Sequence, residues 1–329
     1  MRLVTGLVLT LALTAQTSMA QTHVVVVGGL GGDQAHREKF HAWAVAMIDA
    51  AQQRFGIPEE NITYLAERET LDAERISGKS TKENVERTLA ELAARLDPGE
   101  GVFILLIGHG SYQGDESRFN LPGPDMSSAD FAIVLDRFTA QSIVLINTTS
   151  ASGDFIKDLS GPRRTIITAT KSPFERNETV FCQYFVEAFA QDVADVDKDQ
   201  RISMLEAFNY ATHEVARAYE SDDRLLTEHA QLDDNGDGEG TGEPDPATTD
   251  GALAQAFVME GAEPLVGAAS ADSVLTALQG RQRELQQAIA DLRVRKDSLE
   301  LDAYEIELER LLIELARVSQ AIRDREGGA

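Results

Sequence analysis

Cysteine is almost absent from this chain of 329 residues, in which Cys182 is the only one. A single thiol excludes any disulfide within the chain, so the fold must depend on its hydrophobic core. Basic residues are also scarce, with 30 Lys and Arg against 55 Asp and Glu and a formal net charge of -25. That balance repels polyanions, so we expect no nucleic-acid partner and no binding to anionic membranes.

Long apolar runs are missing as well. The run from Leu3 to Leu13 is shorter than the roughly 20 residues that a membrane-spanning helix needs, and no later stretch approaches that length. The run follows a basic start, Met1-Arg2, and precedes Ser18-Met19-Ala20, which is a small-x-small cleavage site. We therefore predict a signal peptide over residues 1–20 and an exported protein, periplasmic or secreted, with no membrane span after cleavage. An uncleaved anchor is the alternative.

Residues 21–262 alternate between strand and helix patterns. Short, wholly apolar strands are expected at His23–Val27, Val102–Ile107, Ser142–Ile146 and Thr165–Thr168. Helical patterns lie between them, at about 34–55, 81–96 and 129–138. Apolar strands separated by helices are typical of a parallel sheet that is covered on both faces. The predicted fold class is α/β, with a mostly parallel sheet flanked by helices.

Glycines follow the first predicted strand, at residues 28, 29, 31 and 32. Gly29 and Gly31 fit a dinucleotide-binding Gly-x-Gly-x-x-Gly motif, but Gln34 occupies its third glycine position. We interpret the glycines as a tight strand-to-helix turn and predict no nucleotide cofactor.

The composition changes beyond Pro264. Residues 263–272 are rich in Ala, Ser and Gly and are predicted to be a linker. Residues 273–326 then contain no proline and a single glycine, and apolar residues recur every seven positions in two offset series. This pattern predicts one long coiled coil or a helical hairpin that folds near residues 302–304. Its apolar seam needs a partner surface, which is a second copy of the chain, another protein or the chain's own core.

Polar side chains follow two of the buried strands. The strand at 102–107 leads into Gly108-His109-Gly110-Ser111, and the strand at 142–146 leads into residues 147–153, which contain Thr148, Thr149, Ser150 and Ser152. Ligand and catalytic groups of open α/β sheets lie at the carboxyl ends of the strands. The two strand ends are therefore expected to meet at one cleft.

This pair of strand ends resembles the caspase and legumain peptidases, whose His-Gly follows one strand and whose catalytic cysteine follows the next. Legumain-like sequences commonly have Glu-Ala-Cys-x-Ser-Gly at the second end, which aligns with residues 148–153. The resemblance covers roughly Thr22 to Gly261. It implies a caspase-like fold, with His109 as base, Gly110 as donor of an oxyanion-hole amide, and Ser150 in the position of the nucleophilic cysteine.

Serine at the cysteine position changes the chemistry that the resemblance implies. A thiol ionises near pH 8.5, whereas a hydroxyl stays protonated and needs a well-oriented base. We therefore predict an inactive peptidase homologue that binds a peptide or protein partner. A slow hydrolase that uses His109 and Ser150 is the alternative. A simpler interpretation also stands, in which the hydroxyls of residues 148–152 bond backbone groups at a turn.

An acidic loop of twelve residues, Asp195 to Glu206, matches the calcium-binding EF-hand loop. Alternate carboxylates bind a hard cation, the residue at position seven offers its carbonyl, and the last glutamate binds with both oxygens. Gln200 replaces the turn glycine at position six. The predicted calcium ligands are Asp195, Asp197, Asp199, Arg201, Ser203 and Glu206.

A second acidic loop, residues 233–240, begins with the same Asp-x-Asn-x-Asp-Gly pattern but has Pro244 at position twelve. Asp233, Asn235 and Asp237 are predicted as a weaker cation site. The site would be completed by Glu243 or Asp245, or by Glu228 and His229 from upstream. The alternative is an acidic loop without a ligand.

Overall fold

The computed structural model describes residues 21–191, 193–199, 201–261, 273–294 and 299–326. The predicted signal peptide at 1–20 and the predicted linker at 263–272 lie outside the described residues. The first of the described elements, β1, begins at Thr22.

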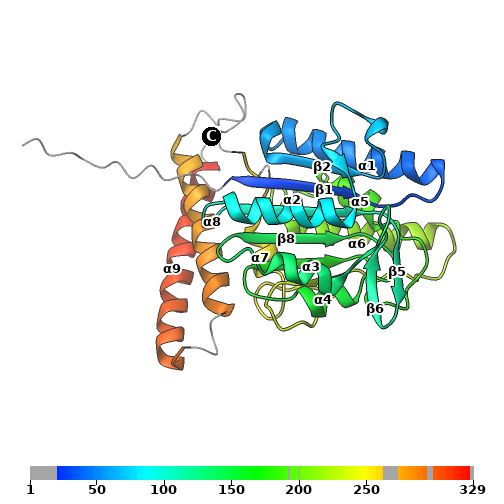
Figure 1. Cartoon of the computed structure of the whole chain (residues 1–329). Coiled ribbons are helices and arrows are strands. Elements are labelled where there is room, and N and C mark those ends of the chain that lie inside the picture. The colour runs from blue at the N-terminus through cyan, green and yellow to red at the C-terminus, as the bar shows by residue number, and fades with distance from the viewer. Residues whose placement is uncertain (1–20, 192, 200, 262–272, 295–298, 327–329) are drawn as a thin grey trace, which may run out of the picture.

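A seven-stranded sheet forms the centre of the molecule, in the order β10-β9-β8-β4-β1-β2-β3 (Figure 1). All of its neighbouring strands pair in parallel except β10, which pairs antiparallel with β9. The strands are β1 (Thr22–Gly28), β2 (Ile62–Ala66), β3 (Gly78–Lys79), β4 (Gly101–Ile107), β8 (Ser142–Asn147), β9 (Arg164–Thr168) and β10 (Gln231–Asp233). The predicted α/β class with a mostly parallel sheet is confirmed.

Helices cover both faces of this sheet, because the central strands are apolar on both sides. Alternate residues of β4 contribute to two separate cores, with Phe103 in one and Ile104 in the other. The first core includes residues of α1, α5 and α6, and the second includes residues of α2, α3 and α4. The helices are α1 (Gln34–Gln53), α2 (Lys82–Arg95), α3 (Ser128–Leu135), α4 (Asp154–Leu159), α5 (Phe181–Ala190), α6 (Met204–Ser221) and α7 (Ala252–Ala256), with short 3-10 turns at Glu59–Asn61 and Glu69–Leu71.

A small antiparallel sheet follows β4 directly and was not expected from the sequence. It consists of β5 (Gly110–Gln113), β6 (Glu116–Phe119) and β7 (Met126–Ser127). Its first strand begins at Gly110, immediately after His109. The small sheet therefore extends from the carboxyl edge of the large one.

The C-terminal region is a helical hairpin of α8 (Ser273–Val294) and α9 (Leu301–Glu326). The two helices lie side by side at one end of the sheet (Figure 1). Leu285 and Leu292 of α8 pack with Tyr304 and Leu311 of α9 in a core of their own. The hairpin alternative is confirmed, but its predicted fold near 302–304 is wrong, because Tyr304 is buried inside the hairpin and the helices are separated by residues 295–300. No described helix combines the length and the apolar character needed to cross a membrane.

Candidate active-site cleft and acidic loops

The two polar strand ends meet, as the sequence predicts. β4 and β8 are neighbours in the sheet, with Leu106 paired with Asn147. Beyond them, Gly110 lies so close to the next turn that an added Cβ would stand 2.1 Å from the Ser150 carbonyl oxygen and 2.5 Å from the Thr149 Oγ1. Glycine is therefore required at residue 110 for the strand ends to approach each other.

His109 is held between aromatic rings of α1. Its ring centroid lies 5.1 Å from that of Phe40 and 4.8 Å from that of His36, and both pairs are edge-to-face. Burial lowers the pKa of His109, and the positive charge of His36 lowers it further. A neutral imidazole near pH 7 is able to accept a proton, as a general base must.

Ser150 is buried beside this imidazole, with 8% of its surface exposed. Its hydroxyl donates to the Gly110 carbonyl oxygen at 3.3 Å, and no hydrogen bond joins it to His109 among the residues that the structure describes. The neighbouring hydroxyls bond in the same way, since Thr148 donates to the Leu106 carbonyl at 2.7 Å and Thr149 to the Asn147 Oδ1 at 2.8 Å. These contacts agree with hydroxyls that satisfy acceptors at a turn.

The turn itself is strained next to Ser150. Ala151 adopts φ 54°, in the left-handed region that residues with a Cβ disfavour by roughly 1 kcal/mol. Its backbone amide donates to the Glu175 carbonyl at 2.8 Å, which holds the conformation. Strain of this kind gathers at functional turns.

His109, Ser150 and Cys182 line one small pocket, together with Phe40, Trp43, Gly108, Thr148, Glu178 and Thr179. Cys182 comes from the first turn of α5, and no motif in the sequence indicates its place at the cleft. Burial raises the pKa of its thiol to about 12, against a weaker lowering by a hydrogen bond with Thr148. A thiol with this pKa is protonated at pH 7 and is a poor nucleophile.

A charged cluster lies at the rim of this pocket. Glu178 forms ion pairs with Lys39 and with His36, whose Nε2 lies 3.3 Å from the Glu178 Oε1. Partial burial acts to raise the pKa of Glu178, but hydrogen bonds from Lys39 and His36 outweigh it and the pKa is lowered. The cluster joins α1 to the segment before α5, and no motif in the sequence indicates it.

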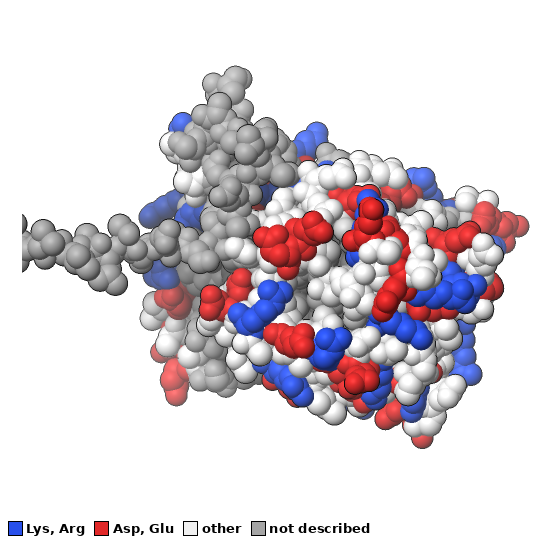
Figure 2. Space-filling view, turned by 45° about the horizontal axis from the view of Figure 1, so that its top comes forward, with Lys and Arg blue, Asp and Glu red and all other residues white. Residues whose placement is uncertain are grey.

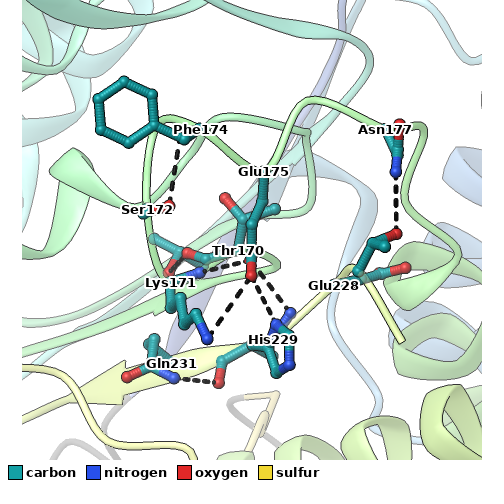
Figure 3. Close-up of polar contacts among 12 residues, drawn as sticks. Thr170, Lys171, Ser172, Phe174, Glu175, Asn177, Glu228, His229 and Gln231 are labelled. Carbon is teal, nitrogen blue, oxygen red and sulfur yellow. Dashed lines mark hydrogen bonds and ion pairs between the residues drawn. The ribbon is translucent and has the colours of Figure 1, made fainter. Parts of the chain in front are cut away.

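Glu175 holds the segment after β9 against the turn that contains Ser150. In Figure 3 the Glu175 carboxylate lies between Lys171 and His229, while the ring of Phe174 lies well away from it. The carboxylate contacts the His229 Nδ1 at 2.5 Å and accepts from the Lys171 backbone amide at 3.0 Å. The carbonyl of the same residue accepts the Ala151 amide described above, so this segment supports the turn that carries Ser150.

Glu228 binds the N-terminus of α5 rather than an acidic loop. Its carboxylate accepts from the backbone amides of Val180 at 2.9 Å and Phe181 at 2.7 Å. Burial raises the pKa of Glu228 to about 7, against the lowering by these amides. The alternative in which Glu228 and His229 complete the loop at 233–240 stays a prediction. In this structure Glu228 binds the amides at the start of α5, and the His229 Nδ1 contacts Glu175.

The loop Asp195–Glu206 gathers three of its predicted ligands. Oxygens of Asp195, Asp197 and Asp199 all lie within 4.8 Å of one another. The Asp199 amide donates to the Asp195 Oδ1 at 3.1 Å, and burial followed by the charge of Asp197 raises the pKa of Asp199 to about 6. Gln200, which replaces the turn glycine at position six, lies outside the described residues.

The end of this loop begins α6. Ser203 caps the helix and forms a capping box with Glu206, whose other oxygen accepts from the Val196 amide at 3.0 Å. Arg201 donates its amide to the Asp199 Oδ1 at 2.9 Å, and its guanidinium pairs with Glu260. The carboxylates at 195, 197 and 199 are an oxygen set suited to a hard cation.

The second acidic loop follows β10. Asp233 is fully buried, and burial raises its pKa to about 6, with the charge of Asp237 acting in the same direction. Asn235 accepts the Asp237 amide at 2.8 Å, which bends the loop into a turn. Figure 2 shows acidic and basic side chains interspersed over one face of the molecule.

Comparisons with known proteins give a structural neighbour but no family. No protein-family model matches the sequence, and no curated protein matches it. The crystal structure of protein GSU0716 from Geobacter sulfurreducens is similar, with a TM-score of 0.44 and 12% sequence identity over 69% of this chain and 96% of that one.

Proposed function

We propose that this chain is an exported homologue of the caspase and legumain peptidases that is disabled by Ser150 and binds a peptide or protein partner. The observation that carries the proposal is the approach of Gly110 to the Ser150 turn. It places a histidine and a serine at the ends of adjacent parallel strands, which is where that family has its histidine and its cysteine. The strained Ala151 and the shared pocket agree with a site built for a nucleophile.

Weak activity follows from the direction of the Ser150 hydroxyl. A serine attacks a carbonyl only when a base within about 2.6–3.2 Å takes its proton. The hydroxyl instead faces the Gly110 carbonyl, which cannot accept that proton as a base would. The neutral imidazole of His109 favours the second candidate, a slow serine hydrolase, if substrate binding turns the hydroxyl toward it.

The test compares the parent chain with Ser150→Cys and with the double variant Ser150→Cys, His109→Ala on a peptide library. We expect the parent to leave the library intact, Ser150→Cys to cleave it, and the double variant to lose that cleavage. Cleavage by the parent that His109→Ala abolishes would replace the proposal with the hydrolase. If neither the parent nor Ser150→Cys cleaves any peptide, the peptidase interpretation of the cleft fails.

We also propose that calcium binds the loop Asp195–Glu206, supported by the three gathered carboxylates. The hydrogen bonds of this loop to the start of α6 would couple the ion to the helix. Calcium should therefore raise the melting temperature of the parent, and Asp197→Ala should make that rise smaller. Equal melting temperatures of the parent in calcium and in chelator would contradict this part.

The helical hairpin is proposed as the surface for self-association. Several large apolar side chains of α9 point to solvent, among them Leu301, Ile306, Leu312 and Ile313. Exposed apolar rows on a helix are typical of an interface with another chain.

A further inference from the structure

Asp233 is a buried carboxylate without a hydrogen-bond partner. It is 0% exposed, and neither of its side-chain oxygens meets hydrogen-bond geometry with a donor among the described residues, although the Ser160 hydroxyl and the Gly236 amide act on it weakly in the direction that lowers its pKa. Taking a carboxylate out of water without a partner is costly, so such groups are paired or coordinate a metal. Its orientation therefore needs a ligand to explain it.

The neighbouring buried carboxylates are satisfied. Asp234 accepts the backbone amides of Gly251 and Ala254, both at 2.8 Å. Asp250 accepts the amides of Asp234 at 3.1 Å and Asn235 at 3.3 Å. Backbone amides thus make full hydrogen bonds to two carboxylates in this region, while no amide among the described residues does so to the third, Asp233.

The two ends of the loop that follows Asp233 are joined by backbone hydrogen bonds, and glycines with positive φ turn the chain between them. Leu232 and Thr241 exchange two backbone hydrogen bonds, each of 2.9 Å. Gly236 and Gly238 both adopt positive φ, at 84° and 78°, which lets the chain turn back over β10. Within this turn the Asp237 carboxylate accepts from the Asn235 Nδ2 at 3.1 Å and from the Glu239 amide at 2.8 Å, and its charge acts on Asp233.

The turn between α4 and β9 lies against the loop that follows Asp233. A Cβ placed on Gly236 would lie 3.5 Å from the Gly161 carbonyl carbon, so the two segments are in contact. Ser160, in the same turn, has a buried hydroxyl oxygen that also lacks a partner. This hydroxyl lies beside Asp233 and acts on its ionisation.

We propose that the Asp233 and Asp237 carboxylates, the Asn235 side-chain oxygen and the Ser160 hydroxyl bind one hard divalent cation, with calcium as its probe. All four groups offer oxygen, the ligand that calcium prefers, and the cation supplies the positive charge that Asp233 lacks. The site joins β10 to the α4–β9 turn. It lies away from the cleft, because Asp233 pairs with Ile166 whereas the cleft lies beyond the other end of β9. It is independent of the loop Asp195–Glu206.

The test is calcium titration of the full chain by calorimetry after removal of metal with a chelator. Asp233→Asn should remove one equivalent of bound calcium. Glu239→Gln is the matched control, because it removes the same charge from an exposed position of the same loop and should keep that equivalent. Asp197→Ala distinguishes the two loops. This variant should still bind the equivalent of calcium that Asp233→Asn loses, whether or not the loop Asp195–Glu206 binds calcium in the parent.

A thermal measurement distinguishes ligand loss from misfolding. In chelator, Asp233→Asn should melt no lower than the parent, because it removes a buried charge, and calcium should raise its melting temperature less than it raises that of the parent. If it fails to fold, Asp237→Asn gives the same test from an exposed position and should weaken calcium binding at least about tenfold. The proposal is overturned if Asp233→Asn binds calcium with the same stoichiometry and affinity as Glu239→Gln. If Asp237→Asn is used instead, calcium binding equal to that of the parent overturns it.

Discussion

Replacing Gly110 by alanine should destabilise the protein strongly, because the residue stands where the two strand ends meet. The new Cβ would lie 2.1 Å from the Ser150 carbonyl oxygen, where ordinary contact begins near 3.4 Å. That oxygen belongs to the backbone, so relief requires the strand ends to separate by about 1 Å, and overpacking of this kind costs about 3 kcal/mol. With a urea m-value of about 3 kcal/mol/M, the midpoint of unfolding should fall by about 1 M.

The control for this prediction is Gly78→Ala at the edge strand β3. An added Cβ there meets only the Leu65 Cδ2, at 3.6 Å, so the change should stay within about 0.5 kcal/mol. Urea unfolding followed by circular dichroism measures both variants. If Gly110→Ala unfolds at the same urea concentration as Gly78→Ala, the close approach of the Gly110 and Ser150 segments is refuted.

Further predictions concern buried groups and the hairpin. Cys182 should not react with a disulfide reagent in the native protein but should react in urea, since its pKa is about 12; fast native labelling would contradict its burial. Glu228 has a folded pKa of about 7, above the ordinary value of about 4.3, so its stabilising contribution is complete below that ordinary value and is lost as the pH rises through 7. The unfolding free energy of the parent should fall between pH 4.5 and 7.5, and in Glu228→Gln this fall should be smaller by on the order of 2 kcal/mol. A pH profile identical to that of the parent would refute this. Replacing both Ile306 and Ile313 by lysine should leave the helix content unchanged and reduce the mass in solution; an unchanged mass argues against self-association through α9.

The central sheet could be predicted because its strands are short, continuous apolar runs. Residues 102–107 and 142–147 are both buried on two faces, and buried parallel strands leave that mark in a sequence. The small sheet after His109 leaves no such mark, since β5 and β6 have four residues each and mix polar with apolar side chains. The turn of the hairpin was misplaced because the seven-residue apolar series continues without a break from Leu292 through Leu299 to Ile306, although α8 ends at Val294 and α9 begins at Leu301.

The cleft could be predicted only in part from the strand ends. The sequence placed His109 and Ser150 after consecutive predicted strands. The rim of their pocket, however, depends on contacts between residues far apart in the sequence, such as that between Lys39 and Glu178. Lysine and glutamate are common surface residues, and nothing in their spacing indicates a pair. The same holds for Glu228, whose position near the second acidic loop in sequence suggested a ligand, whereas the amides at the start of α5 bind it.

Alkylation of Ser150→Cys by iodoacetamide as a function of pH is the decisive measurement of whether His109 acts on the side chain of residue 150. We expect the introduced thiol to react with an apparent pKa below the ordinary value of about 8.5, because His109 lines the same pocket, and we expect His109→Ala to raise this pKa. Mass spectrometry of the peptides separates this thiol from the buried Cys182. A thiol at residue 150 that stays as unreactive as Cys182, or whose pKa ignores His109, would contradict the account.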